Sequence, residues 1–288
     1  MGSLACEGER LLTICIGIPT RNRPILLRRA LASIASQTCL PDEVLIGDNS
    51  DGLESREIYL EWRSRIPCMR YIKREKVLGP THNFLSLVAE SSADHFLWLA
   101  DDDVLDPSLI ARSQECLCTF PGLDYLGWGF VVHNYVTEVA EVPHAFPKVQ
   151  FSSSCYENVC RYLEVPISSY FYGMYRRDLL LRSSLSRWNE LNLSFDWMDV
   201  AFIMSNLLNY RSHFLPECLA TYGIDELVRP VKGAAGSTAR HYDPMPWLMQ
   251  GIVLILCASR LSIFQRIKLL PKFLYAWRNT TSFAINHS

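Results

Sequence analysis

Over its first 130 residues the chain alternates short apolar runs with segments of helical periodicity. The runs are rich in branched and aromatic side chains, which favours buried strands, and the segments between them place apolar residues three and four positions apart. This alternation is typical of βαβ units around a mostly parallel sheet. The strands are predicted at residues 11–18, 43–46, 69–73 and 95–100.

The alternation becomes irregular after residue 130. A strand is predicted at residues 168–176, an amphipathic helix at 196–209 and a late strand at 213–222. Residues 229–246 are rich in Gly, Pro and Ser and predict a mobile loop, and two helices are expected from 246 to about 278. The predicted fold is therefore α/β, with a mostly parallel central sheet flanked by helices and a helical C-terminal extension.

Composition excludes several classes of protein. With 288 residues, 49% hydrophobic, 20% charged and a formal net charge of −2, the chain is expected to be globular, with no nucleic-acid partner. None of the ten cysteines forms a CxxC pair with another, so we expect them to be reduced thiols in a cytoplasmic protein. No secretion signal and no run of ~18–20 apolar residues is visible.

Three polar segments follow predicted strands directly, at residues 19–23, 48–52 and 101–103. Ligands of open α/β sheets bind at the carboxyl ends of the strands, so these segments are expected to converge on one site. The third is Asp101-Asp102-Asp103, whose like charges repel unless solvent or a cation offsets them. Mg²⁺ or Mn²⁺ prefers such oxygen ligands, although an acidic turn before a helix would also explain the triplet.

The motifs around these segments resemble those of family 2 glycosyltransferases. The first motif is Ile18-Pro19-Thr20-Arg21-Asn22-Arg23, and the second runs from Asp42 to Asp51. Gly79-Pro80 with Asn83, followed by Phe96 to Asp103, is similar to the family's DxD region. The resemblance implies a GT-A, Rossmann-like fold with a nucleotide-sugar-binding half at 1–130, an acceptor-binding half at 131–228, and a loop with basic amphipathic helices at 229–288.

The resemblance also implies roles for individual residues. Pro19, Thr20 and Arg21 are expected to line the nucleotide pocket, and Asp48 to accept a hydrogen bond from the imide of uracil or thymine. Further nucleotide contacts are expected from Asn83 and Asp101, and metal coordination by Asp102 and Asp103, with Mn²⁺ or Mg²⁺ as cofactor.

Inverting sugar transfer needs a carboxylate that takes the proton of the acceptor hydroxyl. Residues 195–199 resemble the acidic segment that supplies this base in the family, and Asp196 and Asp199 lie one helical turn apart. Both are therefore candidates for the catalytic base. Acids that only stabilise a helix N-terminus are the alternative.

The resemblance implies a metal-dependent hexosyltransferase that moves a sugar from a UDP- or dTDP-linked donor to an acceptor hydroxyl with inversion. The expected acceptor is a glycan or a lipid-linked molecule in bacterial polysaccharide or glycolipid assembly. A small-molecule acceptor and a non-catalytic sugar-nucleotide-binding protein remain open. Sugar-nucleotide pyrophosphorylases are disfavoured because residues 19–24 contain no glycine.

The C-terminal tail carries a cationic charge. Between Arg260 and Arg278 there are five basic residues and no acid, interleaved with Leu, Ile, Phe and Trp. Helices of this composition lie on anionic bilayers, although a helical pair packed on the catalytic half has a similar composition. The predicted location is cytoplasmic, either free or at the inner face of the membrane.

Overall fold

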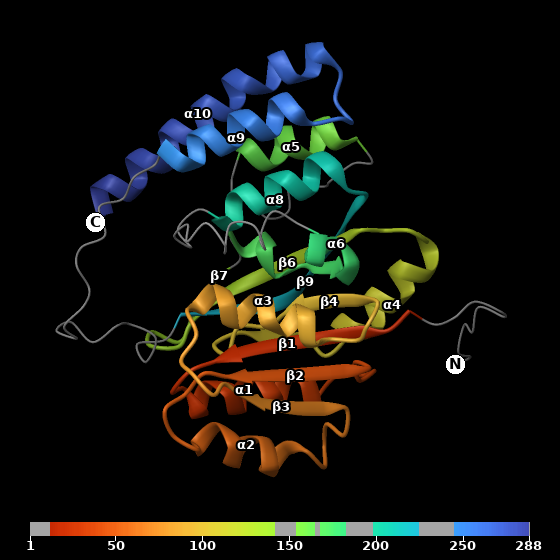
Figure 1. Cartoon of the computed structure of the whole chain (residues 1–288), viewed down its shortest axis with the longest axis vertical. Coiled ribbons are helices and arrows are strands. Elements are labelled where there is room, and N and C mark those ends of the chain that lie inside the picture. Colours follow the sequence, from red (N-terminus) through yellow and green to blue (C-terminus); the bar gives the residue numbers. More distant parts are fainter. Residues whose placement is uncertain (1–11, 142–153, 165–167, 183–197, 225–244, 288) are drawn as a thin grey trace.

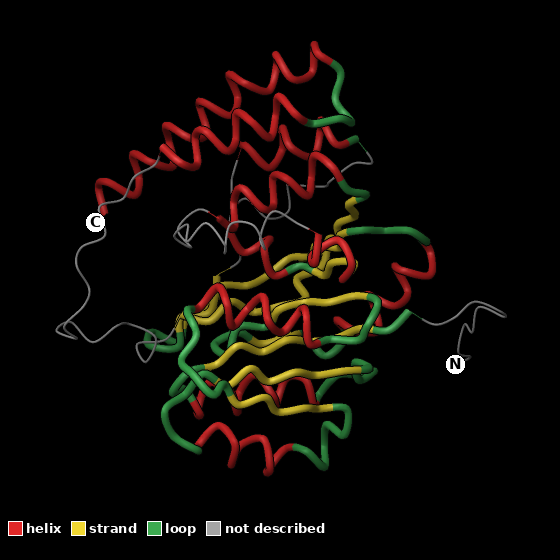
Figure 2. Tube along the Cα trace, viewed as in Figure 1, coloured by secondary structure: helices red, strands yellow, loops and turns green. Residues whose placement is uncertain are grey.

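The structure is a computed structural model of the whole chain, and it describes residues 12–141, 154–164, 168–182, 198–224 and 245–287. Strands and helices alternate through the first half, as predicted (Figures 1 and 2). The elements of this half are β1 (Ile14–Thr20), α1 (Pro24–Ala35), β2 (Glu43–Asp48), α2 (Glu54–Trp62), β3 (Met69–Lys73), α3 (Pro80–Glu90), β4 (His95–Trp98), β5 (Val104–Leu105) and α4 (Leu109–Thr119).

The second half adds strands to the same sheet and a layer of helices. Its strands are β6 (Tyr125–Asn134), β7 (Val139–Glu141), β8 (Met174–Arg176) and β9 (Ser212–Ile224). Its helices are α5 (Cys155–Glu164), the 3₁₀ helix η2 (Ser168–Tyr172), α6 (Arg177–Arg182), α8 (Met198–Asn209), α9 (Met245–Cys257) and α10 (Ile263–His287).

The described strands form one mixed sheet in the order β3-β2-β1-β4-β8-β6-β9-β5, with β7 paired to β6. Strands β3, β2, β1 and β4 are parallel, and β8 runs antiparallel between β4 and β6. This mixed α/β sheet flanked by helices is the GT-A type of fold that the motifs predicted. The register sets Thr20 beside Asp48 and Gly17 beside Trp98, so the carboxyl ends of β1, β2 and β4 meet at one edge.

Hydrophobic cores lie on both faces of the sheet, because β1 alternates between them. Ile14, Ile16 and Ile18 pack toward α1 and α4, whereas Cys15 belongs to the core that includes α3 and α8. Gly17 lies on the α3 side, where an added Cβ would approach Phe96 to 2.3 Å. The absence of a side chain at this position therefore leaves room for the ring of Phe96 from β4, beside Leu87 of α3.

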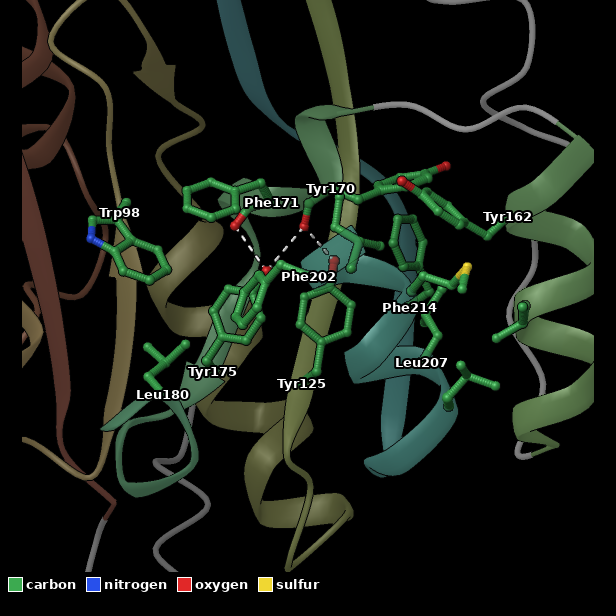
Figure 3. Packing of buried hydrophobic residues seen from close by; sticks show 14 of the residues in the cluster. Trp98, Tyr125, Tyr162, Tyr170, Phe171, Tyr175, Leu180, Phe202, Leu207 and Phe214 are labelled. Carbon is green, nitrogen blue, oxygen red and sulfur yellow. Dashed lines mark hydrogen bonds between the residues drawn. The ribbon is translucent and has the colours of Figure 1, made fainter. Parts of the chain in front are cut away.

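An aromatic cluster joins the sheet to the helical layer (Figure 3). The rings of Trp98 and Phe171 stack with centroids 4.9 Å apart, and Phe202 of α8 packs on Phe171 and Tyr175 at 5.8 and 5.4 Å. Aromatic pairs at such distances add to the stabilisation from buried area. The cluster therefore fixes η2 and α8 against β4.

Residues 168–176 were predicted as a strand, and this prediction was wrong for their first half. The segment forms η2, followed by the short strand β8. The hydroxyl of Tyr125 donates to the Tyr170 carbonyl at 2.8 Å, and that of Tyr175 donates to the Phe171 carbonyl at 2.9 Å (Figure 3). In a strand, these backbone carbonyls would accept hydrogen bonds from a neighbouring strand. Here the two tyrosine hydroxyls donate to them, so tertiary contacts stabilise a tight turn instead of a strand.

Helices α5, α8, α9 and α10 pack on one another in a layer beside the sheet. Figure 1 shows α10 outermost at one end of the molecule and α2 at the opposite end. Over the part of the chain that the structure describes, every helix is too short or too polar to cross a bilayer. The two C-terminal helices were predicted, and they lie against α5 and α8.

Truncation of Phe202 tests the importance of the aromatic cluster. Phe202 is 1% exposed, so Phe202→Ala should lower the free energy of unfolding by about 3–5 kcal/mol. The same truncation at Phe264, which is 75% exposed on α10, should change it by less than about 0.5 kcal/mol. Urea denaturation followed by circular dichroism measures both. Equal losses would show that the cluster contributes nothing specific.

Candidate functional site

A cavity of about 370 Å³ lies at the edge where β1, β2 and β4 end. Six of the residues predicted to bind nucleotide or metal line it: Pro19, Thr20, Arg21, Asn83, Asp101 and Asp102. Asp48 and Asp103 are not among the lining residues. The other lining residues are Arg23, Asn49, Leu78, Pro80, Phe84, Ala100, Tyr172 and Tyr222.

The loop after β1 is shaped by Asn22. This residue has a φ of 56°, a left-handed conformation that Asn adopts more readily than most residues. Its backbone N–H donates to Ser50 Oγ at 2.7 Å, and its side chain exchanges two hydrogen bonds with Asp51. The loops after β1 and β2 are thereby tied together, and the two arginines that flank Asn22 line the cavity.

Asp101 is buried beside the loop after β1. One carboxylate oxygen accepts a hydrogen bond from Thr20 Oγ1 at 2.7 Å, and the other accepts one from Arg23 at 3.1 Å. Burial raises the pKa of Asp101, and the Arg23 charge and the Thr20 hydroxyl offset this only in part. A further positive charge in the cavity would therefore stabilise its ionised form.

Asp102 is the more exposed acid of the cavity wall, with 17% of its side chain accessible. Its carboxylate lies 3.8 Å from Arg23, and its backbone carbonyl accepts a hydrogen bond from Arg29 of α1 at 3.0 Å. The backbone of Asp102 is therefore anchored while its carboxylate is accessible from the cavity.

Asp103 contacts β9 instead of lining the cavity. Its carboxylate accepts the Gly223 N–H at 2.9 Å, and a Cβ on Gly223 would meet the Asp102 carbonyl at 2.1 Å. Burial first, and then the charge of Asp102, raise the pKa of Asp103 well above its ordinary value. The contact joins the acidic turn to the second half of the chain, and metal coordination by Asp103 stays a prediction.

Asp48 is fully buried at the end of β2. One oxygen accepts the Ser50 N–H at 2.9 Å, and the other accepts from Tyr71 at 2.5 Å and from Lys73 at 3.1 Å. Burial alone would raise its pKa, but these hydrogen bonds outweigh burial and lower it. In this arrangement Asp48 orders the loop after β2. Contact with a nucleotide base stays a prediction.

Asn83 is held in the first turns of α3. Its side chain donates to the Gly47 carbonyl at 2.8 Å and accepts from Arg74 at 2.9 Å. The side chain of Asn49 is held in a similar way: it donates to the Leu78 carbonyl and accepts from the Leu78 N–H, both at 2.8 Å. Both amides are thus fixed on the cavity wall by the strands and loops around them.

The two candidates for the catalytic base are placed unequally. Asp196 lies outside the described residues. Asp199 belongs to the first turn of α8, the helix that packs against η2 and α5. The role of both residues as the catalytic base stays a prediction.

The motifs missed the aromatic part of the wall. Phe84, Tyr172 and Tyr222 come from α3, η2 and β9, and the ring of Tyr172 packs on Phe171 with centroids 5.3 Å apart. The aromatic run at residues 170–172 was a visible signal, but a strand prediction could not say which ring faces a ligand. The second half of the chain therefore contributes aromatic surface to the cavity wall.

Asp101 and Asp102 suit a hard divalent cation that shares its coordination with a ligand. Within the described residues, no group of three or more His, Cys, Asp or Glu side chains is arranged to hold a metal ion. Mg²⁺ is often bound by one or two carboxylates together with phosphate oxygens, and these two acids offer that number at the cavity wall.

The fold is of the GT-A type, and comparison with known proteins gives the family. The model of glycosyl transferase family 2 matches residues 15–182. The chain belongs to this family. Among curated proteins, none matches by sequence.

Solved structures of S. aureus TarS share the fold. TarS 1–349 in complex with UDP is 18% identical, with a TM-score of 0.66 over 91% of this chain and 71% of that one. The complex with UDP-GlcNAc is 17% identical, with a TM-score of 0.68 over 92% and 72%. The alignment with a longer TarS structure covers 91% of this chain and 43% of the TarS chain.

The hydrogen bond from Tyr71 to Asp48 predicts a pH-dependent loss of stability. Tyr71→Phe should lower the free energy of unfolding by about 1–3 kcal/mol at pH 7, because a buried carboxylate loses a donor. The pKa of Asp48 is lowered from its ordinary value of 3.8, so its ionisation stabilises the fold above that pH. This contribution is lost as pH falls through the folded-state pKa.

The difference in the free energy of unfolding between wild type and Tyr71→Phe should therefore become smaller at acid pH. Urea titrations between pH 3 and 7 measure it. Tyr59→Phe is the control, since that ring stacks on Tyr71 at 5.4 Å but its hydroxyl makes no hydrogen bond to the described residues. A loss that is independent of pH, or equal in both variants, would contradict this role of Tyr71.

Proposed function

We propose that the chain transfers a sugar from a nucleotide diphosphate donor to an acceptor hydroxyl, with the cavity at the carboxyl ends of β1, β2 and β4 as its donor site. The observation that carries this proposal is the presence of both charges in one cavity, whose lining includes the guanidiniums of Arg21 and Arg23 and the carboxylates of Asp101 and Asp102. Guanidinium groups bind phosphate oxygens, and carboxylates hold the cation that such phosphates share.

The proposed base of the donor is uracil or thymine. TarS, which shares the fold, has been solved with UDP and with UDP-GlcNAc. In this chain Asp48 is the predicted acceptor for the imide N–H, and its oxygens are bound to Ser50, Tyr71 and Lys73. Because Asp48 is fully buried, base recognition by Asp48 requires that one of these neighbours moves aside.

The proposed cofactor is Mn²⁺ or Mg²⁺, with Asp102 and Asp101 as its protein ligands. Members of family 2 often use divalent metals. When bound there, the cation supplies positive charge that offsets the charge developing on the departing nucleotide diphosphate. Thr20 holds Asp101 in place, and Arg29 holds the backbone of Asp102, so the carboxylates need little rearrangement.

The acceptor is proposed to approach from the side of Tyr172 and Tyr222, with Asp196 or Asp199 removing its proton and inversion as the outcome. A glycan or a lipid-linked acceptor in polysaccharide or glycolipid assembly is the first candidate. A small-molecule acceptor and a non-catalytic binding protein are the competing outcomes of the experiment that follows.

Turnover of sugar nucleotides tests the proposal. With Mn²⁺ present, calorimetry should show tighter binding of UDP or dTDP than of GDP, and wild type should release UDP from one member of a UDP-sugar panel. Asp102→Asn should slow that release by roughly 100-fold or more, the scale of losing one charge-stabilising group. Asp178→Asn, on α6 and away from the cavity, should have no effect.

Tighter binding of GDP would contradict the base assignment. Equal rates for wild type and Asp102→Asn would contradict the metal assignment. Binding of UDP without turnover of any donor, with or without added acceptors, would indicate that the chain is a non-catalytic sugar-nucleotide-binding protein.

We propose a membrane surface as a further partner, through α9 and α10. Large apolar side chains are exposed on both helices: Met249, Val253, Leu256, Ile263, Phe264, Ile267, Leu274 and Tyr275. Lys268 and Lys272 are exposed among them, and Arg260 and Arg278 lie at either end. An apolar face with basic residues fits the interface of an anionic bilayer, where each basic residue is worth ~1 kcal/mol.

Vesicle co-sedimentation tests this partner. The double variant Phe264→Ser/Ile267→Ser should bind anionic vesicles roughly 10-fold more weakly than wild type, because two large apolar side chains no longer enter the bilayer. Leu60→Ser is the control, since Leu60 is 44% exposed on α2 at the opposite end of the molecule (Figure 1). Wild type that stays in the supernatant at low salt would contradict the proposal.

A further inference from the structure

Arg23 occupies an unusual position for a cavity arginine, because its guanidinium lies on the two acids that suit a divalent cation. The same nitrogen is 3.1 Å from Asp101 and 3.8 Å from Asp102. Arg23 is also the residue before Pro24, where α1 begins, and 35% of its side chain is exposed. It is therefore held at its backbone while its side chain borders the open cavity.

Arg23 and a divalent cation cannot both occupy the acids. Mg²⁺ binds carboxylate oxygens at about 2.0–2.1 Å, so it would lie within a few ångströms of a guanidinium that contacts the same oxygens. Two like charges at that distance repel strongly in a partly buried site. One cation must leave the acids when the other binds.

Asp101 can tolerate the departure of Arg23. The Thr20 hydroxyl still donates to it, and an incoming cation replaces the lost positive charge. The long side chain of Arg23 can then turn into the cavity, where Arg21 is the other cation among the lining residues. Two guanidiniums in one cavity are a suitable site for a diphosphate.

We propose that Arg23 is an exchangeable counter-cation. It neutralises Asp101 and Asp102 before the donor binds, and it yields them to a divalent cation and contacts the diphosphate once the donor is present. This inference rests on the proposed function and adds an order to it: the cation alone binds weakly because it must displace Arg23. Donor and cation together bind tightly, since the displaced guanidinium gains a new partner.

One substitution should therefore change two affinities in opposite directions. Arg23→Gln should bind Mn²⁺ alone about 10-fold more tightly than wild type, and should bind UDP in saturating Mn²⁺ about 10-fold more weakly. Arg21→Gln is the matched control, because Arg21 lines the same cavity without an ion pair to the acids. It should weaken UDP binding and leave the affinity for Mn²⁺ alone unchanged.

Electron paramagnetic resonance of free Mn²⁺ measures the first affinity on the full chain, and calorimetry measures the second. Arg23→Lys keeps the positive charge and should bind Mn²⁺ alone as weakly as wild type, which separates charge competition from a structural effect. Thermal melts of each variant confirm that it is folded.

Affinity for Mn²⁺ alone that is unchanged or weaker in Arg23→Gln would overturn the competition. Unchanged UDP binding in that variant would overturn the contact with the diphosphate. Failure of the proposed function looks different: no sugar nucleotide would bind wild type, whereas the Mn²⁺ measurement would still show tighter binding in Arg23→Gln.

Discussion

The parallel pairing of β1 with β2 on one side and with β4 on the other is the constraint on which the site depends. Because parallel strands end at the same edge, it brings the loop after β1, the loop after β2 and the acidic turn after β4 together. The hydrogen bonds of Asn22 to Ser50 and Asp51, and of Thr20 to Asp101, form across these neighbouring ends. Changes that disturb the middle of β1 should therefore disturb the cavity too.

Electrostatics at this edge follow from burial. Asp48, Asp101 and Asp103 are all nearly inaccessible, yet the pKa of Asp48 is lowered while burial raises the other two. The difference lies in the number of donors: Asp48 has Ser50, Tyr71 and Lys73, whereas Asp103 has one backbone N–H. The negative charge of the acidic turn is therefore not fully neutralised, and Arg23 offsets only part of it.

The two halves of the chain are joined at the site as well as through the core. Gly223 of β9 touches the backbone and carboxylate of the acidic turn, and the aromatic cluster around Trp98 continues through Phe171 to Tyr172 on the cavity wall. Rings fixed in this way offer a rigid surface within the cavity. Such rigidity would suit the proposed transfer, in which a donor and an acceptor must be held in a fixed relative position.

The sequence by itself determined the α/β class and the first four strands, because apolar periodicity and turn residues are local signals, and its resemblance to the motifs of family 2 indicated six residues of the cavity. It also indicated the acids at 101–103, but the three carboxylates look alike in sequence. Only the tertiary structure decided that Asp102 faces the cavity while Asp103 contacts Gly223 of β9, 120 positions along the chain. It also decided that residues 168–172 form a 3₁₀ helix and that the Arg23 guanidinium contacts the carboxylate of Asp101. Both depend on contacts between residues that are far apart in the sequence, which a local pattern cannot predict.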